Sequence, residues 1–284
     1  MRMFRHVLTG FRLVILAGIV FLNWVLIALF LSAFGTSDTV AGVGALLVEG
    51  GLVALAFTPA GEAYFRRVNR LRRPTPQEER VLRPAFERVT ARCGLEVMPD
   101  LFVQQNPCPN ALAAGTKTVA VTQGLLQQAT PEELEAVLAH EVGHLVNGDT
   151  RVRLVAFVAN AAGSVALWVL TGFMLVMSAV GFGGWLAGGD RSLLGLGWMI
   201  LLIAWTIKAS AWVLTKVLEL SYLAVNRREE FAADAYAARN GYRDALVSFL
   251  SRVPDVKPQG LVAALHATHP APEARIDRLM RMGV

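Results

Sequence analysis

The sequence is poor in cysteine and in histidine, and it contains long stretches with almost no charge. Its 284 residues include two cysteines, Cys93 and Cys108, which are too few for a disulfide framework and do not form a CxxC pair. We therefore interpret both as structural free thiols. Histidine occurs only five times, so two histidines at ligand spacing stand out against a small background.

Four stretches without charge, or nearly so, exclude an ordinary soluble protein. A spanning helix needs about 20 apolar residues, whereas helices of soluble proteins average about 12. The chain is 54% hydrophobic, and its mean hydropathy is +0.46. The first stretch is too long for the apolar core of a signal peptide, so we predict a retained anchor. The predicted spans are residues 13–37, 39–61, 154–189 and 192–218.

Three charged residues interrupt these stretches. Glu49 lies near the middle of the second, and Lys208 and Lys216 lie in the fourth, which reaches the length of a span only with its lysine-bearing extension. An acid inside a span is often functional. The alternative is a packing residue beside Gly50 and Gly51, and the sequence leaves both interpretations open.

The arginines flank the apolar stretches on one side. The net charge is +5 and the pI is about 9.6, an excess that fits nucleic acid or anionic lipid. The placement of the arginines next to the apolar stretches favours a lipid bilayer as the partner and argues against nucleic acid. The positive-inside rule places both termini and residues 64–150 in the cytoplasm, so we expect a multi-pass protein of the cell (inner) membrane. The flanking arginines are Arg2, Arg5, Arg12, Arg66, Arg67, Arg70, Arg72, Arg73, Arg80, Arg83, Arg151, Arg153, Arg227 and Arg228.

The region between the second and third spans is predicted to mix helices and strands. Residues 74–94 have helical spacing, and residues 100–105 and 117–124 resemble short strands joined by a turn or hairpin at 110–116. Thr130-Pro131-Glu132-Glu133 forms a capping box with proline at the first helical position. A helix is therefore predicted from Pro131 to Asn147, where Gly148 ends it.

This helix carries the pattern His-Glu-x-x-His. Residues four apart share a helix face, so His140 and His144 can direct their imidazoles at one point. Glu141 is rotated by about 100° from His140 and borders that point. Two zinc ligands and a carboxylate base have this arrangement, in which zinc lowers the pKa of a bound water to about 7. A chance match is on the order of one in a hundred; the alternative is two surface histidines beside a solvated glutamate.

A catalytic zinc needs a third protein ligand. The metzincin pattern is excluded because Asn147 and Thr150 stand where it requires glycine and histidine. A glutamate on a second helix is the other common solution. The helical stretch 226–241 offers three acids, of which two share a face, so that one could bind metal while the other orients a histidine. A solvated acidic helix is the alternative. The three acids are Glu229, Glu230 and Asp234.

Three motifs together resemble the HtpX family of membrane zinc metalloproteases, relatives of the CAAX prenyl-protein endopeptidases. They are HEVGH at 140–144, EFAAD at 230–234 after a long apolar segment, and THPAPEARIDRL at 268–279. PNALA at 109–113 is similar to the family's PNAFA, with Leu112 in place of its aromatic residue. The resemblance covers nearly the whole chain and implies quality control of damaged membrane proteins.

The resemblance also implies roles for individual residues. It puts zinc on His140, His144 and Glu230, makes Glu141 the base, and matches Asp234 to an aspartate that orients a ligand. The histidine of the family's His-Pro motif is His269, and the arginine that follows it is Arg275.

Further candidates concern the transition state and the substrate. His269 is suited to stabilise negative charge on the carbonyl oxygen, although it could equally cap the turn at Pro270. Asn110 is a weaker candidate for substrate contact. Residues 117–122, with Val119, Ala120 and Val121 at their centre, are predicted as an edge strand that pairs with an extended substrate.

We therefore expect a mainly α-helical integral membrane protein with four transmembrane helices and a cytoplasmic α+β zinc protease domain of gluzincin type. The rivals are a prenyl-protein endopeptidase with the same site, disfavoured because those relatives have more spans, and a membrane scaffold without catalysis. The expected segments are residues 1–61 with two spans, 62–150 with the catalytic helix, 151–218 with two more spans, and 219–284 with the third zinc ligand.

Overall fold

The computed structural model describes residues 2–96, 98–252 and 270–282, with the backbone alone for residues 2–12 and 218–226. The chain divides into two compact units, each built from two stretches of sequence. The first combines Met1–Ala54 with Ala156–Ser221, and the second combines Leu55–Val155 with Tyr222–Val284.

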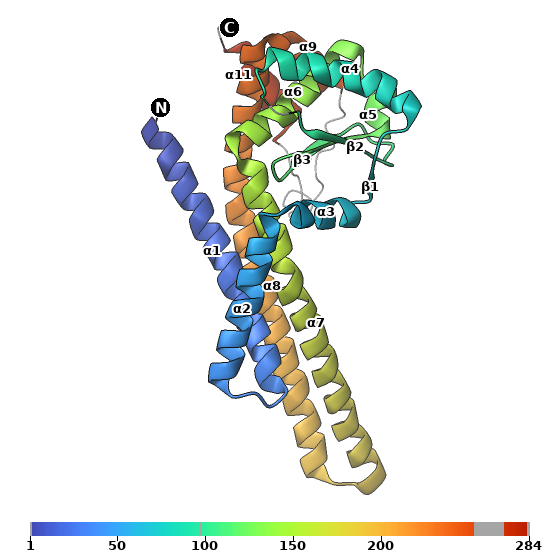
Figure 1. Ribbon diagram of the computed structural model, residues 1–284. Coiled ribbons are helices and arrows are strands. Elements are labelled where there is room, and N and C mark those ends of the chain that lie inside the picture. The colour runs from blue at the N-terminus through green and yellow to red at the C-terminus, as the bar shows by residue number, and fades with distance from the viewer. Residues whose placement is uncertain (1, 97, 253–269, 283–284) are drawn as a thin grey trace. The chain divides into compact units, whose positions relative to one another are not determined.

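The first unit is helical (Figure 1). It contains α1 (Arg2–Ala33), most of α2 (Asp38–Ala56), and large parts of the long helices α7 (Asp149–Gly188) and α8 (Arg191–Ala237). Among the described residues, four helices are long and apolar enough to cross a membrane, which confirms the four predicted stretches. The candidate spans are Leu13–Ala33, Asp38–Ala56, Asp149–Gly188 and Arg191–Val217.

The interior of this unit is made by small side chains, and its surface is apolar. Ala45 packs with Ile27 and Ala166 in a buried cluster. Large apolar side chains face outward instead, among them Trp205 at 72% exposure and Leu202 at 70%. A soluble protein rarely exposes so much apolar surface, whereas lipid tails solvate it.

The second unit is built around a four-stranded sheet of order β1-β2-β4-β3. β2 and β4 are parallel, and the two outer strands pair antiparallel with their neighbours. Figure 1 shows α4, α6 and α9 on one side of the sheet and α3 on the other. The strands are β1 (Leu71–Arg72), β2 (Asp100–Gln104), β3 (Ala111–Ala114) and β4 (Thr118–Thr122).

The helices of this unit pack into one core against the sheet. Leu82 and Phe86 of α4 join Leu138 and Val142 of α6 in it, each fully buried. The helices are α3 (Pro59–Val68), α4 (Pro76–Arg92), α5 (Gln123–Gln128), α6 (Pro131–Asn147), α9 (Arg243–Arg252) and α11 (Pro272–Met280), with a π-helical turn, η1 (Ala238–Tyr242), after α8.

The predicted ends of α6 are confirmed. The Thr130 hydroxyl accepts a hydrogen bond from the backbone N–H of Glu133, whose side chain accepts one from the backbone of Thr130 in return. At the other end Gly148 adopts φ +76°, a left-handed conformation that glycine takes without strain.

The structure decides two predictions about the sheet. The turn or hairpin predicted at 110–116 is a hairpin, in which residues 111–114 form β3 and pair with β4. The prediction that residues 117–122 form an edge strand is wrong, because β4 lies between β2 and β3 and its backbone is paired on both sides. Val119, Ala120 and Val121 are at most 1% exposed. The alanine-rich β3 has weak strand propensity, so its position at the edge was not visible in the sequence pattern.

Candidate metal centre

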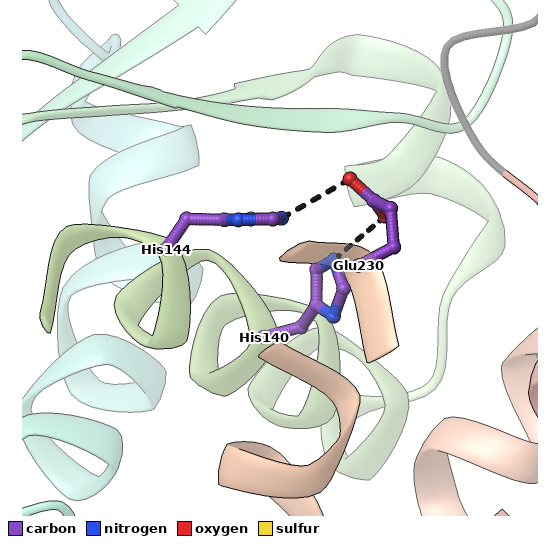
Figure 2. A group of neighbouring side chains, drawn as sticks. All are labelled: His140, His144 and Glu230. Carbon is purple, nitrogen blue, oxygen red and sulfur yellow. Dashed lines mark ion pairs between the residues drawn. The ribbon is translucent and has the colours of Figure 1, made fainter. Parts of the chain in front are cut away.

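Two helices bring the three predicted ligands together, as Figure 2 shows. His140 and His144 come from α6 and Glu230 from α8, and their exposures are 3%, 2% and 0%. Nε2 of His140 lies 3.4 Å from one Glu230 oxygen, and Nε2 of His144 lies 3.3 Å from the other. One ligand atom from each residue lies within 4.8 Å of the other two, so the group could hold a single metal ion.

An aspartate contacts each imidazole ring at Nδ1, the ring nitrogen that points away from Glu230. Nδ1 of His140 lies 2.8 Å from Asp234 Oδ1, and Nδ1 of His144 lies 2.9 Å from Asp149 Oδ2. A carboxylate in this position accepts a hydrogen bond from Nδ1–H, which keeps the proton on Nδ1 and leaves the lone pair on Nε2. Both rings are therefore oriented with Nε2 toward Glu230.

The residues present fit a bound metal. Neither Nε2 atom has a hydrogen-bond partner, although both are buried. Buried polar atoms are nearly always satisfied, so two of them facing one point indicate a missing ligand. Two imidazole nitrogens and one carboxylate oxygen form the donor set of a catalytic zinc site with an open position.

Arginines surround the carboxylates. Arg275 of α11, 8% exposed, donates two hydrogen bonds to Asp234, at 2.9 and 2.6 Å. Arg153 of α7 donates to Glu229 at 2.8 Å and lies 3.8 Å from Glu230. These charges compensate the burial of the acids and fix their positions.

A glycine permits the two ligand helices to approach each other. A Cβ at Gly143 would lie 3.0 Å from the Cα of Ala233 and 3.2 Å from its carbonyl oxygen. Ala233 is next to Asp234 in sequence and three residues after Glu230. The absence of a side chain at Gly143 therefore sets the distance between the histidines and the acids.

The surrounding charges shift the ionisation of the site. Burial lowers the pKa of His144, but the hydrogen bond with Asp149 and the nearby carboxylate of Glu230 outweigh burial and raise the pKa to about 10. Burial raises the pKa of Asp234, but the hydrogen bonds from Arg275 and His140 outweigh it and lower the pKa to about 2. The site thus keeps Asp234 ionised and favours a positive charge at the histidines, whether a proton or a metal ion.

The other predicted residues are placed as follows. Glu141 is 4% exposed beside His140 on α6. Asn110 is exposed at the start of β3, where its backbone bonds to Thr122. Glu229 is 2% exposed and paired with Arg153, so the alternative of a solvated acidic helix does not hold at this position. His269 lies outside the described residues.

Sequence reasoning missed Asp149 and Arg153. Asp149 is 0% exposed and holds His144 from five residues further along the chain. Because Gly148 ends α6 between them, helical spacing could not relate the two. The available signal was an acid directly after a predicted helix end.

Comparison with known proteins gives a consistent result. The model of Peptidase family M48 matches residues 76–282. Protease HtpX of Alcanivorax borkumensis is 31% identical over 257 residues, which cover 81% of this chain and 80% of that protein. A protease HtpX homolog of Sulfurovum sp. is 31% identical over 221 residues, or 68% of this chain and 72% of that protein.

A likeness of fold extends to a crystal structure of S. mikatae Ste24p. The TM-score is 0.52 at 19% sequence identity, and the match covers 91% of this chain. It covers 62% of the Ste24p chain, so this protein spans less than two thirds of that structure.

Proposed function

The chain belongs to peptidase family M48, and from this premise we propose that it is a membrane-embedded zinc endopeptidase whose site faces the cytoplasm. One observation carries the proposal: the two buried Nε2 atoms of His140 and His144 face Glu230 while aspartates hold both Nδ1 atoms. A structural ion pair would not need both rings oriented in this way. His140, His144 and Glu230 would hold the zinc.

Zinc, when bound, supplies a Lewis acid that lowers the pKa of water and polarises the peptide carbonyl. Glu141 accepts the proton of the attacking water and passes it to the leaving amine. Asp149 and Asp234 keep the histidines in the tautomer that can bind metal. His269 remains a proposed donor to the carbonyl oxygen.

The outer edge of β3, which pairs with no strand in the described part of the chain, replaces β4 as the proposed substrate contact. Thr122 N–H donates to Asn110 C=O, so these residues form a hydrogen-bonded pair. Because such pairs alternate along an antiparallel ladder, Leu112 bonds to β4 and Ala113 directs its N–H and C=O away from it. An extended substrate can add to this edge, which also packs against the metal helix α6.

The substrates are proposed to be polypeptides, in particular damaged or misfolded membrane proteins, as the relation to HtpX proteases suggests. Purified protein should contain one zinc per chain and cleave casein. Glu141→Gln removes the base but no ligand, so it should keep zinc and lose about 10²–10⁴-fold in turnover. Zinc analysis beside casein cleavage tests this, and an active Glu141→Gln protein would contradict the mechanism.

The two rivals give different results in the same assays. A prenyl-protein endopeptidase would cleave a farnesylated CAAX peptide in preference to casein. A scaffold without catalysis would cleave neither substrate, whatever its zinc content.

A further inference from the structure

Helix α3 of the second unit has one face fixed to the sheet. Glu62 is 7% exposed and accepts hydrogen bonds from the backbone N–H of Thr116 at 2.7 Å, from its hydroxyl at 3.0 Å, and from the Thr118 hydroxyl at 2.7 Å. Gly115, at φ +62°, leaves the space that the Glu62 carboxylate occupies. The turn between β3 and β4 is thereby attached to α3.

The opposite face of α3 is exposed and mostly apolar. At 100° per residue its exposed positions fall on one continuous arc. Tyr64 is 40% exposed and Val68 is 50% exposed, and Phe57, just before the helix, is 69% exposed. The exposed residues of α3 after Pro59 are Ala60, Ala63, Tyr64, Arg67 and Val68.

Arginine dominates the charge around this face. Residues 57–73 contain five arginines against one acid, the buried Glu62. Arg66 and Arg73 lie over the ring of Phe102, at 5.0 and 4.5 Å, and Arg72 pairs with Glu78. Arg67 and Arg70 are exposed, and no carboxylate pairs with either within the described part of the chain.

We propose that α3 lies in the headgroup layer of the membrane, with its exposed face in the lipid and with Arg67 and Arg70 binding the phosphates of anionic phospholipids. The candidate span α2 ends at Ala56, and α3 begins at Pro59, a gap that an extended chain crosses in about 10 Å. Exposed apolar residues beside basic ones are the signature of an interfacial helix. Through Glu62, lipid contact at α3 would also hold the turn that ends β3.

The position of α3 can be measured by fluorescence quenching in nanodiscs. The full-length protein, with Cys93→Ala and Cys108→Ser, would carry one bimane-labelled cysteine at Tyr64, Val68 or Glu87, an exposed residue of α4. Shallow doxyl lipids should quench the labels at 64 and 68 several-fold more strongly than the label at 87. Labels at 64 and 68 that doxyl lipids quench no more strongly than the label at 87 would overturn the proposal. Aqueous iodide separates the two causes, because it would quench the labels on a solvent-facing α3 and would not reach those on a protein-covered one.

The lipid chemistry is tested with the same label at Val68. Doxyl phosphatidylglycerol should quench it more strongly than doxyl phosphatidylcholine at equal mole fraction. This preference should disappear in Arg67→Gln/Arg70→Gln and persist in Arg80→Gln, which changes an exposed arginine of α4. Equal quenching by both lipids in the parent protein would overturn the anionic selectivity.

Discussion

The two units bury acidic side chains in different surroundings. At the candidate metal centre Asp234 contacts both Arg275 and His140, and Glu230 faces both histidines. In the first unit Glu49 is 1% exposed, and neither of its oxygens has a hydrogen-bond partner among the side chains that the structure describes. A connected network directs ligand atoms to a point, whereas burial alone does not identify a functional acid.

Removal of a proposed metal ligand should have the largest effect on zinc content and on activity. Glu230→Ala leaves two histidines, which are too few for a tight zinc site. We expect zinc and casein cleavage to be lost together, as measured by metal analysis and turnover of the same preparation.

Glu87→Ala is the matched control, because Glu87 is an exposed glutamate of the same unit. Glu229→Ala is not a neutral control, since Arg153 would lose a hydrogen bond to a carboxylate beside Glu230. If Glu230→Ala kept its zinc, the proposed ligand set would be wrong.

The next largest effect on zinc binding is expected from the two aspartates that contact Nδ1 of the histidines. Asp149→Asn and Asp234→Asn each remove the charge that orients one histidine, so each should weaken zinc affinity by about 10–100-fold. Competition with a chromogenic chelator measures this change. Asp100→Asn alters a partly exposed ion pair with Arg73 and should leave affinity unchanged; an Asp149→Asn protein that behaved like it would remove Asp149 from the site.

These residues also show what the sequence could and could not predict. The length of a span and the HExxH spacing are both properties of a single helix. Composition therefore predicted the four spans, and the helical period predicted that His140 and His144 share a face. For the second helix, spacing gave three candidate acids, and the family resemblance was needed to select Glu230 as the metal ligand and Asp234 as the acid that orients a histidine. Asp149 lies beyond a helix end, and the position of β3 depends on which strands pair. Neither arrangement could be predicted, because neither follows from the spacing of residues within one helix or strand.

A smaller effect on activity is expected at the outer edge of β3. Ala113→Pro removes an outward N–H without breaking the ladder to β4. One lost backbone hydrogen bond is worth about 0.5–1.5 kcal/mol, so KM for an extended peptide should rise by about 2–10-fold while kcat changes little.

Leu112→Pro is the contrasting variant. It removes a hydrogen bond to β4 instead, so it should lower stability. An Ala113→Pro protein with unchanged KM would exclude pairing of substrate at this edge.

The smallest effect is expected in the first unit, at Glu49. Ala41, Ala45 and Glu49 follow one another at steps of four on the buried face of α2, and each is at most 1% exposed. Glu49→Gln conserves volume and shape, so it neither leaves a cavity nor overfills the cluster. Zinc content should be unchanged and turnover should stay within about twofold, because no described contact links this acid to the metal centre.

Ala45→Leu, one turn away, overfills the cluster with Ile27 and Ala166 and should cost about 1–3 kcal/mol. Thermal unfolding in detergent, monitored by size-exclusion chromatography, ranks the two variants. If Glu49→Gln lost activity while keeping zinc and stability, the acid would be functional, and the difference drawn between the two units would fail.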